Sequence, residues 1–366
     1  MVKVDRSIKL ADHQTVQDLK ARDGVGPYNT AVVDSDWLRE VALEAGADDV
    51  GFVSLQDPAV AGERDYVREA LPGAQSLVSI CLRSNRENMR SVARSMASHE
   101  LYAVRDHVDL ITRAIARRLE DLGVRAVSPP MDVPMEATRY PDRMWIVSQK
   151  TVAVAAGLGH MGIHRNVIHP RFGTFIGLGT VIVQPRLTSY SEPLSTNPCI
   201  DCQLCVDVCP VGAIKPDGRF ESHACATHNN HESYTGFISW VKQIADSKNG
   251  KDYARRFTDP ETSAIWQTLA YKPTVRCAYC VSVCPAGEDV VGLYMNDREK
   301  HLDRTARRYQ ERAEYIYVTP GSPAEDHLVR NFPTKRPRHV PYSTARPDPE
   351  AQEQRPLPAP DEEGDS

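Results

Sequence analysis

The spacing of its cysteines constrains this chain more than any other feature. Residues 199–210 read C-x2-C-x2-C-x3-C-P, residues 277–285 read C-x2-C-x3-C-P, and Cys225 lies between the two runs. In such runs the closely spaced thiolates bind one cubane cluster, while the cysteine before proline binds a second cluster. The spacing therefore predicts two [4Fe-4S] clusters in a ferredoxin-like module.

The same rule assigns the ligands crosswise between the two runs. The ligands expected for cluster one are Cys199, Cys202, Cys205 and Cys284. Those expected for cluster two are Cys209, Cys225, Cys277 and Cys280. Zinc also binds four thiolates from C-x2-C pairs, but its sites rarely use a triple run followed by Cys-Pro, so we favour clusters. The ninth cysteine, Cys81, lies in an apolar segment and is expected to be a core thiol.

Composition and charge set broad limits on function. The chain has 366 residues, of which 41% are hydrophobic and 25% charged, as in ordinary soluble proteins. Its net charge of -5 argues against nucleic-acid binding driven by overall charge. The N-terminal residues contain no apolar core of signal-peptide length, and no apolar run reaches the roughly 18 residues of a spanning helix. We therefore expect a cytoplasmic protein with no membrane partner.

Before the cysteines, the apolar pattern alternates between strand and helix. Residues 49–55 and 77–82 read as strands, and residues 104–122 carry an apolar stripe at helical spacing. Residues 144–156 fit another helix. This alternation predicts an α/β fold, a three-layer sandwich with helices on both faces of a sheet.

The changes of composition along the chain divide it into five segments. We expect an N-terminal arm at 1–30, an α/β domain at 31–190, a dicluster ferredoxin-like domain at 191–293 with a helical insertion at about 226–272, a helix at 294–316, and a Pro-rich tail, extended or disordered, at 317–366.

Glycine is concentrated between Ala153 and Gln184. Residues 157–162 match G-x-G-x-x-G, the fingerprint of dinucleotide-binding folds. The match follows an expected helix instead of opening from a strand, so nucleotide binding is a weak alternative. Glycines in such numbers let the backbone approach another group closely. They mark a candidate end point for the electrons that the clusters carry.

The order of motifs resembles that of the cobalamin-dependent iron–sulfur reductases, which include reductive dehalogenases and epoxyqueuosine reductases. The motifs are AGLG-x2-G, HPRFG and the two cysteine runs, and the resemblance is specific over about residues 150–290. It implies a nitroreductase-like domain that binds base-off cobalamin beside one cluster. The glycines that it assigns to the corrin pocket are Gly157, Gly159, Gly162, Gly173, Gly177 and Gly179.

The resemblance also implies a proton donor over the open face of cobalt. Epoxyqueuosine reductases use an aspartate upstream of AGLG and reductive dehalogenases a tyrosine, and this chain has Tyr140 and Asp142. A turn before a helix would explain the same two residues. Cobalamin in this family is typically bound without a protein histidine, so His160 and His164 are expected to have structural or hydrogen-bonding roles.

We expect a reductase of the dehalogenase-like group with a small-molecule substrate and an external electron donor of the ferredoxin or flavodoxin type. One alternative is epoxyqueuosine reduction in tRNA, which the acidic net charge and the Pro-rich tail disfavour. Another is a dicluster electron carrier without catalysis of its own. His223, His228 and His231 flank Cys225, and we expect them to lie near cluster two without binding iron.

Overall fold

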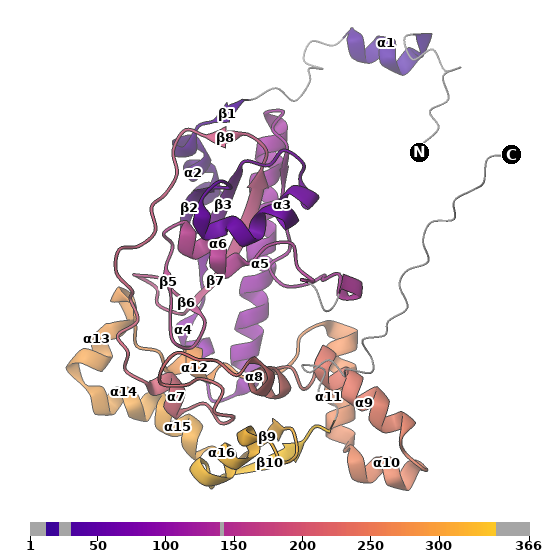
Figure 1. Ribbon diagram of the computed structural model, residues 1–366, viewed down its shortest axis with the longest axis vertical. Coiled ribbons are helices and arrows are strands. Elements are labelled where there is room, and N and C mark those ends of the chain that lie inside the picture. The colour runs from indigo at the N-terminus through magenta and orange to yellow at the C-terminus, as the bar shows by residue number, and fades with distance from the viewer. Residues whose placement is uncertain (1–11, 22–30, 140–142, 342–366) are drawn as a thin grey trace, which may run out of the picture.

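A four-stranded antiparallel sheet forms the centre of the first domain in the computed structural model, which describes residues 12–21, 31–139 and 143–341 (Figure 1). The strand order is β2-β3-β7-β4. The strands are β2 (Asp49–Ser54), β3 (Ser76–Arg83), β7 (Ile176–Val183) and β4 (Ala126–Val127). The two long central strands, β3 and β7, are paired over their whole length, from Ser76 with Val183 to Arg83 with Ile176.

Two helices, α2 (Ser35–Glu44) and α5 (Arg94–Asp121), cover one face of this sheet. The expected apolar stripe of α5 lies in the core with Val78, Ile80 and Val181 of the sheet. The helix begins at Arg94, nearly three α-helical turns earlier than we expected, and extends toward the cysteine-rich module (Figure 1). It stops before Gly123, whose φ of 70° ends a helix without steric cost.

The other face is covered by η2 (Pro58–Glu63), α3 (Arg64–Ala70) and α6 (Gln149–Ala155). Leu77 and Ile182 of the sheet pack with Val152 of α6 in a second core. Cys81 lies in that core with no exposed surface, as predicted. The expected helix–sheet–helix layers are therefore confirmed, while the likeness to nitroreductases stays a prediction.

Short elements complete this part of the chain. They are α1 (Gln14–Lys20), β1 (Val32–Val33), α4 (Arg86–Met89), η3 (Ala137–Arg139), β5 (His160–Met161), β6 (Val167–Ile168) and β8 (Arg186–Leu187). β1 pairs in parallel with β8, and β5 pairs with β6. The loop between β5 and β6 is part of the glycine-rich segment and extends toward the cysteine-rich module (Figure 1).

Short helices carry some of the cysteines, and a second group of helices stands to one side (Figure 1). The former are α7 (Leu204–Asp207), α8 (Ser222–Asn229) and α12 (Tyr279–Val283). The latter form the expected insertion: α9 (Tyr234–Ala245), α10 (Gly250–Arg256) and α11 (Asp259–Tyr271). A capping box between Thr258 and Glu261 begins α11.

The C-terminal part differs from two of our expectations. The single helix at 294–316 is replaced by α13 (Glu288–Asn296), α14 (Arg298–Arg304), α15 (Ala306–Glu311) and the start of β9 (Glu314–Val318). Asp297 interrupts the helix because it caps α14, its carboxylate accepting the N–H of Lys300 at 2.9 Å.

Part of the expected Pro-rich tail is regular structure. It forms α16 (Pro323–Asn331) and β10 (Lys335–His339), and β10 pairs in parallel with β9. Pro323 is at the first turn of α16, where a missing N–H costs nothing, and Pro337 is in a two-stranded sheet where one side of each strand is unpaired. Proline count alone therefore predicted disorder wrongly for 317–341, and 342–366 lie outside the described residues.

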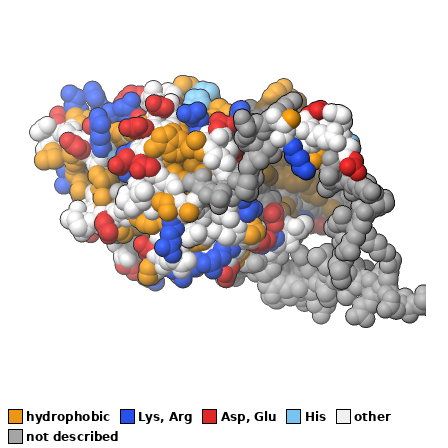
Figure 2. Space-filling model, turned by 90° about the horizontal axis from the view of Figure 1, so that it is seen from above, with side chains coloured by type: hydrophobic (Ala, Val, Ile, Leu, Met, Phe, Trp, Pro, Cys, Tyr) orange, Lys and Arg blue, Asp and Glu red, His pale blue; other side chains and the backbone are white. Residues whose placement is uncertain are grey.

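Side chains of both charges lie on the face of the molecule that Figure 2 presents. Figure 2 shows basic and acidic side chains interspersed, without one large basic area on the face seen there. Within the described ranges, no helix is long and apolar enough to cross a membrane.

Candidate iron–sulfur and cofactor site

The eight cysteines surround two separate cavities. The smaller cavity is lined by Cys199, Cys202, Cys205 and Cys284. The larger, of about 380 Å³, is lined by Cys209, Cys225, Cys277 and Cys280. These are the two crossed sets expected from the spacing. In the part of the chain that the structure describes, no group of three or more His, Cys, Asp or Glu could hold a single metal ion. Thiols spread around a cavity suit a cluster better than one zinc ion.

Electrostatic coupling between thiols follows the same division. Burial raises the pKa of Cys205, and the thiols that add to this effect are Cys284, Cys202 and Cys199. Burial likewise raises the pKa of Cys225 to about 12, with Cys277 and Cys209 adding to it. Holding several negatively charged thiolates in one buried site costs free energy. The positive charge of bound iron would offset this cost and so favour deprotonation of the thiols.

The two sets also lie close to one another. Cys205, from the smaller cavity, is among the thiols that raise the pKa of Cys280 in the larger one. His164 lines both cavities. The arrangement therefore brings the two proposed clusters together as neighbours in one relay.

Backbone N–H groups surround the sulfurs. Ala213 donates its N–H to Cys209 Sγ at 3.3 Å. Burial raises the pKa of three further cysteines, and a backbone hydrogen bond opposes the rise in each. The donor is Leu204 for Cys202, Tyr279 for Cys277 and Ala286 for Cys284. Such donors stabilise negative charge on sulfur, and hydrogen bonds of this kind are one determinant of cluster potential.

The larger cavity contains cationic and amide groups that sequence reasoning did not single out together. Lys150 Nζ donates to Arg165 O at 2.6 Å and to Asn166 Oδ1 at 2.9 Å. All three residues line the cavity, as does Arg276, which directly precedes the second cysteine run. Burial lowers the pKa of Lys150, while Cys280 and Cys225 oppose that shift. In the sequence, the one indication of this group was Lys150, a basic residue at the start of α6.

Each of the predicted corrin-pocket glycines packs closely against the protein itself. Side-chain Cβ atoms added at Gly157 and Gly173 would lie 2.3 Å from Glu192 O and 2.1 Å from Ala286 O. At Gly177 and Gly179 they would meet Val104 and Val108 of α5. The structure thus explains these glycines by close packing, and their assignment to a corrin pocket stays a prediction.

The HPRFG segment connects the sheet domain to the second cysteine run. His169 Nδ1 accepts the N–H groups of Arg171 and Phe172 at 3.1 and 3.3 Å, and its Nε2 lies 3.0 Å from Asp49 Oδ2. Gly173, with φ of 68°, lies against Ala286, two residues after Cys284. This motif therefore fixes a turn beside cluster one.

Tyr140 and Asp142, the predicted proton donors, lie outside the described residues. Their assignment stays a prediction.

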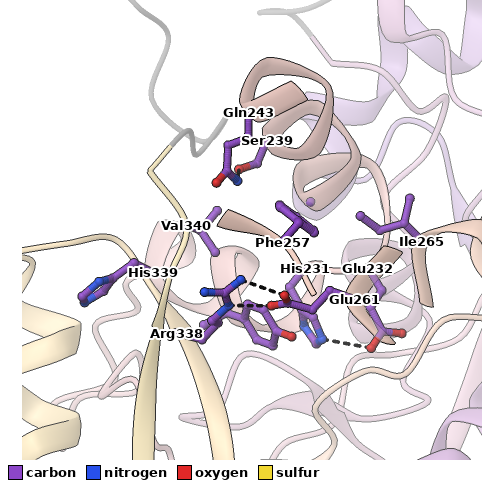
Figure 3. A pocket seen from close by; sticks show the side chains of 12 residues that line it. His231, Glu232, Ser239, Gln243, Phe257, Glu261, Ile265, Arg338, His339 and Val340 are labelled. Carbon is purple, nitrogen blue, oxygen red and sulfur yellow. Dashed lines mark hydrogen bonds and ion pairs between the residues drawn. The ribbon is translucent and has the colours of Figure 1, made fainter. Parts of the chain in front are cut away.

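A further small pocket lies between the insertion and β10 (Figure 3). Arg338 donates to both carboxylate oxygens of Glu261 at 2.6 and 2.7 Å. On another side of the pocket, His231 Nε2 contacts Glu232 Oε1 at 3.1 Å. These side chains bind one another across the pocket, so it reads as a junction between elements.

Comparisons with known proteins agree with the cysteine pattern. The family model described as "4Fe-4S binding domain" matches residues 194–215, which confirms that the first run belongs to such a domain. Epoxyqueuosine reductase of Staphylococcus aureus (strain NCTC 8325 / PS 47) is 27% identical over 187 residues, covering 48% of this chain and 45% of the relative. That of Synechococcus sp. (strain CC9605) is 27% identical over 222 residues, covering 58% of this chain and 64% of the relative.

These matches confirm the resemblance to the iron–sulfur reductases. The chain spans less than two thirds of the length of either relative. A solved epoxyqueuosine reductase with a tRNA stem loop gives a TM-score of 0.42 at 17% identity, covering 81% of both chains. A catabolic reductive dehalogenase gives 0.46 at 13% identity, covering 84% of this chain and 39% of that one. Structural likeness at this level supports no inference by itself.

Proposed function

We propose that the protein is a reductase in which two [4Fe-4S] clusters pass electrons from an external donor of the ferredoxin or flavodoxin type to a bound cobalamin. The observation that carries this proposal is the pair of neighbouring cysteine-lined cavities, the larger of which also holds Lys150, Arg165 and Arg276. A plain electron carrier would need the cysteines but not the cationic side chains that line the larger cavity with them, so we favour an enzyme over a carrier.

The larger cavity is chemically suited to lie beside a corrinoid. Amide and phosphate oxygens of that cofactor are hydrogen-bond acceptors, and Lys150, Arg165, Asn166 and Arg276 offer donors. The Nε atom of Arg276 is buried without a partner among the described residues, so a donor remains available there. A cobalamin bound beside this cavity, outside the space that cluster two would fill, would supply strongly reducing cobalt.

For the substrate, epoxyqueuosine in tRNA is better supported than the small molecule that the sequence led us to expect. The reason is that the curated relatives are named epoxyqueuosine reductases. A small-molecule substrate is the second candidate, because basic and acidic side chains are interspersed on the visible face in Figure 2, with no broad basic surface there for RNA.

Anaerobic purification with cobalamin, followed by iron analysis and visible and EPR spectroscopy, tests the cofactor proposal. We expect eight irons and a bound corrinoid per chain. Eight irons without any corrinoid would favour the electron carrier instead.

The substrate requires a separate experiment. In tRNA from a deletion strain, epoxyqueuosine should accumulate and disappear again when the gene is restored. Normal queuosine in that strain, with no second enzyme present, would exclude the tRNA substrate and leave the small-molecule reductase.

The crossed ligand sets predict which cluster each cysteine variant loses. Cys199→Ser and Cys284→Ser should lose the same cluster, and Cys225→Ser and Cys280→Ser the other, as distinguished by EPR of the remaining cluster. Cys81→Ala is the control and should retain all the iron, because Cys81 lies in the core of the first domain. Loss of different clusters from the Cys199 and Cys284 variants would contradict the crossed assignment.

A further inference from the structure

Two buried histidines line the larger cysteine cavity, and each has one ring nitrogen without a partner. His164 comes from the glycine-rich loop and is 3% exposed, and His228 comes from α8 and is 2% exposed. Both line the cavity that contains the four proposed ligands of cluster two. In both rings the unpartnered atom is Nε2.

The other ring nitrogen of each histidine accepts a backbone hydrogen bond. Asn166 donates its N–H to His164 Nδ1 at 3.1 Å, and Tyr317 donates its N–H to His228 Nδ1 at 3.3 Å. A neutral imidazole whose Nδ1 accepts a hydrogen bond carries its proton on Nε2. Each ring is therefore held as an Nε2–H donor.

Both rings are neutral in this arrangement, because an Nδ1 that accepts a backbone N–H cannot carry a proton itself. Leaving a buried N–H donor without an acceptor costs about 1–3 kcal/mol, so two such donors beside one cavity call for acceptors within it.

Neighbouring groups hold each ring in place. Gly162 admits the His164 ring, since a Cβ there would lie 2.8 Å from His164 Cε1. His231 stacks on Tyr317 with ring centroids 3.8 Å apart, and its Nδ1 donates to His228 O at 2.5 Å. The other ring nitrogen of His231, Nε2, contacts Glu232 Oε1 at 3.1 Å, as Figure 3 shows. The two donors are therefore fixed from the protein side.

We infer that His164 and His228 donate Nε2–H hydrogen bonds to sulfur atoms of cluster two and so raise its reduction potential. The inference rests on the proposed cluster binding and needs neither the corrinoid nor the substrate. Hydrogen bonds to sulfur stabilise the extra negative charge of the reduced cluster, which makes reduction easier. Cluster one has His164 at its cavity but not His228, so cluster two receives the larger effect.

A pulsed EPR experiment on the unaltered holoprotein tests the contact directly. With ¹⁵N-labelled histidine, the reduced cluster should show weak hyperfine coupling to imidazole nitrogen, and exchangeable protons should respond to D₂O. Absence of imidazole coupling, with eight irons present and the cluster fully reduced, would overturn the inference. Iron and sulfide analysis of the same sample reports on cluster binding separately.

Matched variants test the effect on potential. His228→Leu and His164→Leu should each shift the midpoint of cluster two to lower potential, and His228→Gln and His164→Gln, which retain a side-chain N–H, should recover part of the shift. Unchanged midpoints in both leucine variants at full iron content would overturn the inference. If His228→Leu loses iron, the two His164 variants and the ¹⁵N-labelled unaltered protein still decide whether the inference holds.

Discussion

At the scale of single residues, close packing against neighbouring groups explains why glycine occupies particular positions, which the number of glycines did not show. Gly173 has φ of 68°, and a Cβ there would lie 2.1 Å from Ala286 O, while a Cβ at Gly287 would lie 2.5 Å from Gly173 N. This contact fastens the HPRFG turn to the loop that follows Cys284. Only a residue without Cβ fits both the backbone conformation and the space.

Replacing Gly173 should therefore damage the cluster-one side of the junction. We expect Gly173→Ala to lower the free energy of unfolding by about 2 kcal/mol or more and to reduce iron content, because it combines left-handed backbone strain with a steric clash. Denaturant unfolding and iron analysis measure the two effects. Gly62→Ala is the matched control, since nothing lies within 4 Å of a Cβ there. Equal behaviour of the two variants would contradict this account.

At the scale of elements, polar contacts attach the C-terminal helices and strands to the cysteine module. His301 of α14 is buried and its Nε2 donates to Val283 O at 3.1 Å, at the end of α12. Arg338 of β10 binds Glu261 of α11 and also Arg256 O at 2.5 Å. Both contacts depend on charge or protonation, so both can be tested by changing it.

The contact of His301 predicts a pH dependence. Burial lowers its pKa, with Arg90 adding to the effect and the hydrogen bond to Val283 opposing it. The unfolded chain therefore binds more protons than the folded one between the folded pKa and about 6.5, and stability falls as pH drops through that window. Thermal unfolding of intact holoprotein from pH 7.5 to 5.5 should show this loss, by at most about 1.4 kcal/mol per pH unit.

Two histidine variants separate the contribution of His301 from that of other histidines. His301→Leu, the test variant, should be less stable than the unaltered protein at pH 7.5 but should lose less stability on acidification. The exposed His107 provides the comparison, because His107→Leu removes a histidine away from this contact. A His301→Leu variant with the full pH slope of the unaltered protein would contradict the assignment.

The ion pair between β10 and α11 predicts a local effect. Glu261→Gln should weaken this junction by about 0.5–1 kcal/mol, since the pair is bidentate but partly exposed to solvent. Hydrogen exchange should quicken in α11 and β10 while β3 keeps its protection. Asp217→Asn, at the exposed Asp217–Arg219 pair, is the control and should leave exchange unchanged. Unaltered exchange in Glu261→Gln would show that apolar packing alone holds the insertion.

At the scale of the whole molecule, one core lies on each face of the sheet, and a third core contains or contacts six of the eight cluster cysteines. Cys205 and Cys209 pack with Leu204, Val208 and Val283, in a core separate from those on the two faces of the sheet. The module therefore relies on its cysteine loops for its own packing. Metal sites of this kind contribute binding energy to folding.

Removal of iron should consequently unfold the module before the sheet domain. In hydrogen exchange of the iron-free protein we expect α7 and α12 to lose protection, while β3 and β7 retain theirs. The comparison needs only holoprotein and chelated protein. Equal loss in both regions would indicate one cooperative unit that spans the chain.

The sequence by itself determined the cysteine sets, the helix–sheet layers and the buried position of Cys81, because ligand spacing and apolar periodicity are local properties. It could not predict α16 and β10, since proline count does not tell a helix start or a strand in a two-stranded sheet from a disordered tail. Tertiary structure decided that Lys150, His164 and His228 meet beside the same four cysteines. Lys150 and His164 come from α6 and the loop after it, whereas His228 comes from α8 in the cysteine module, and only packing brings it to the other two.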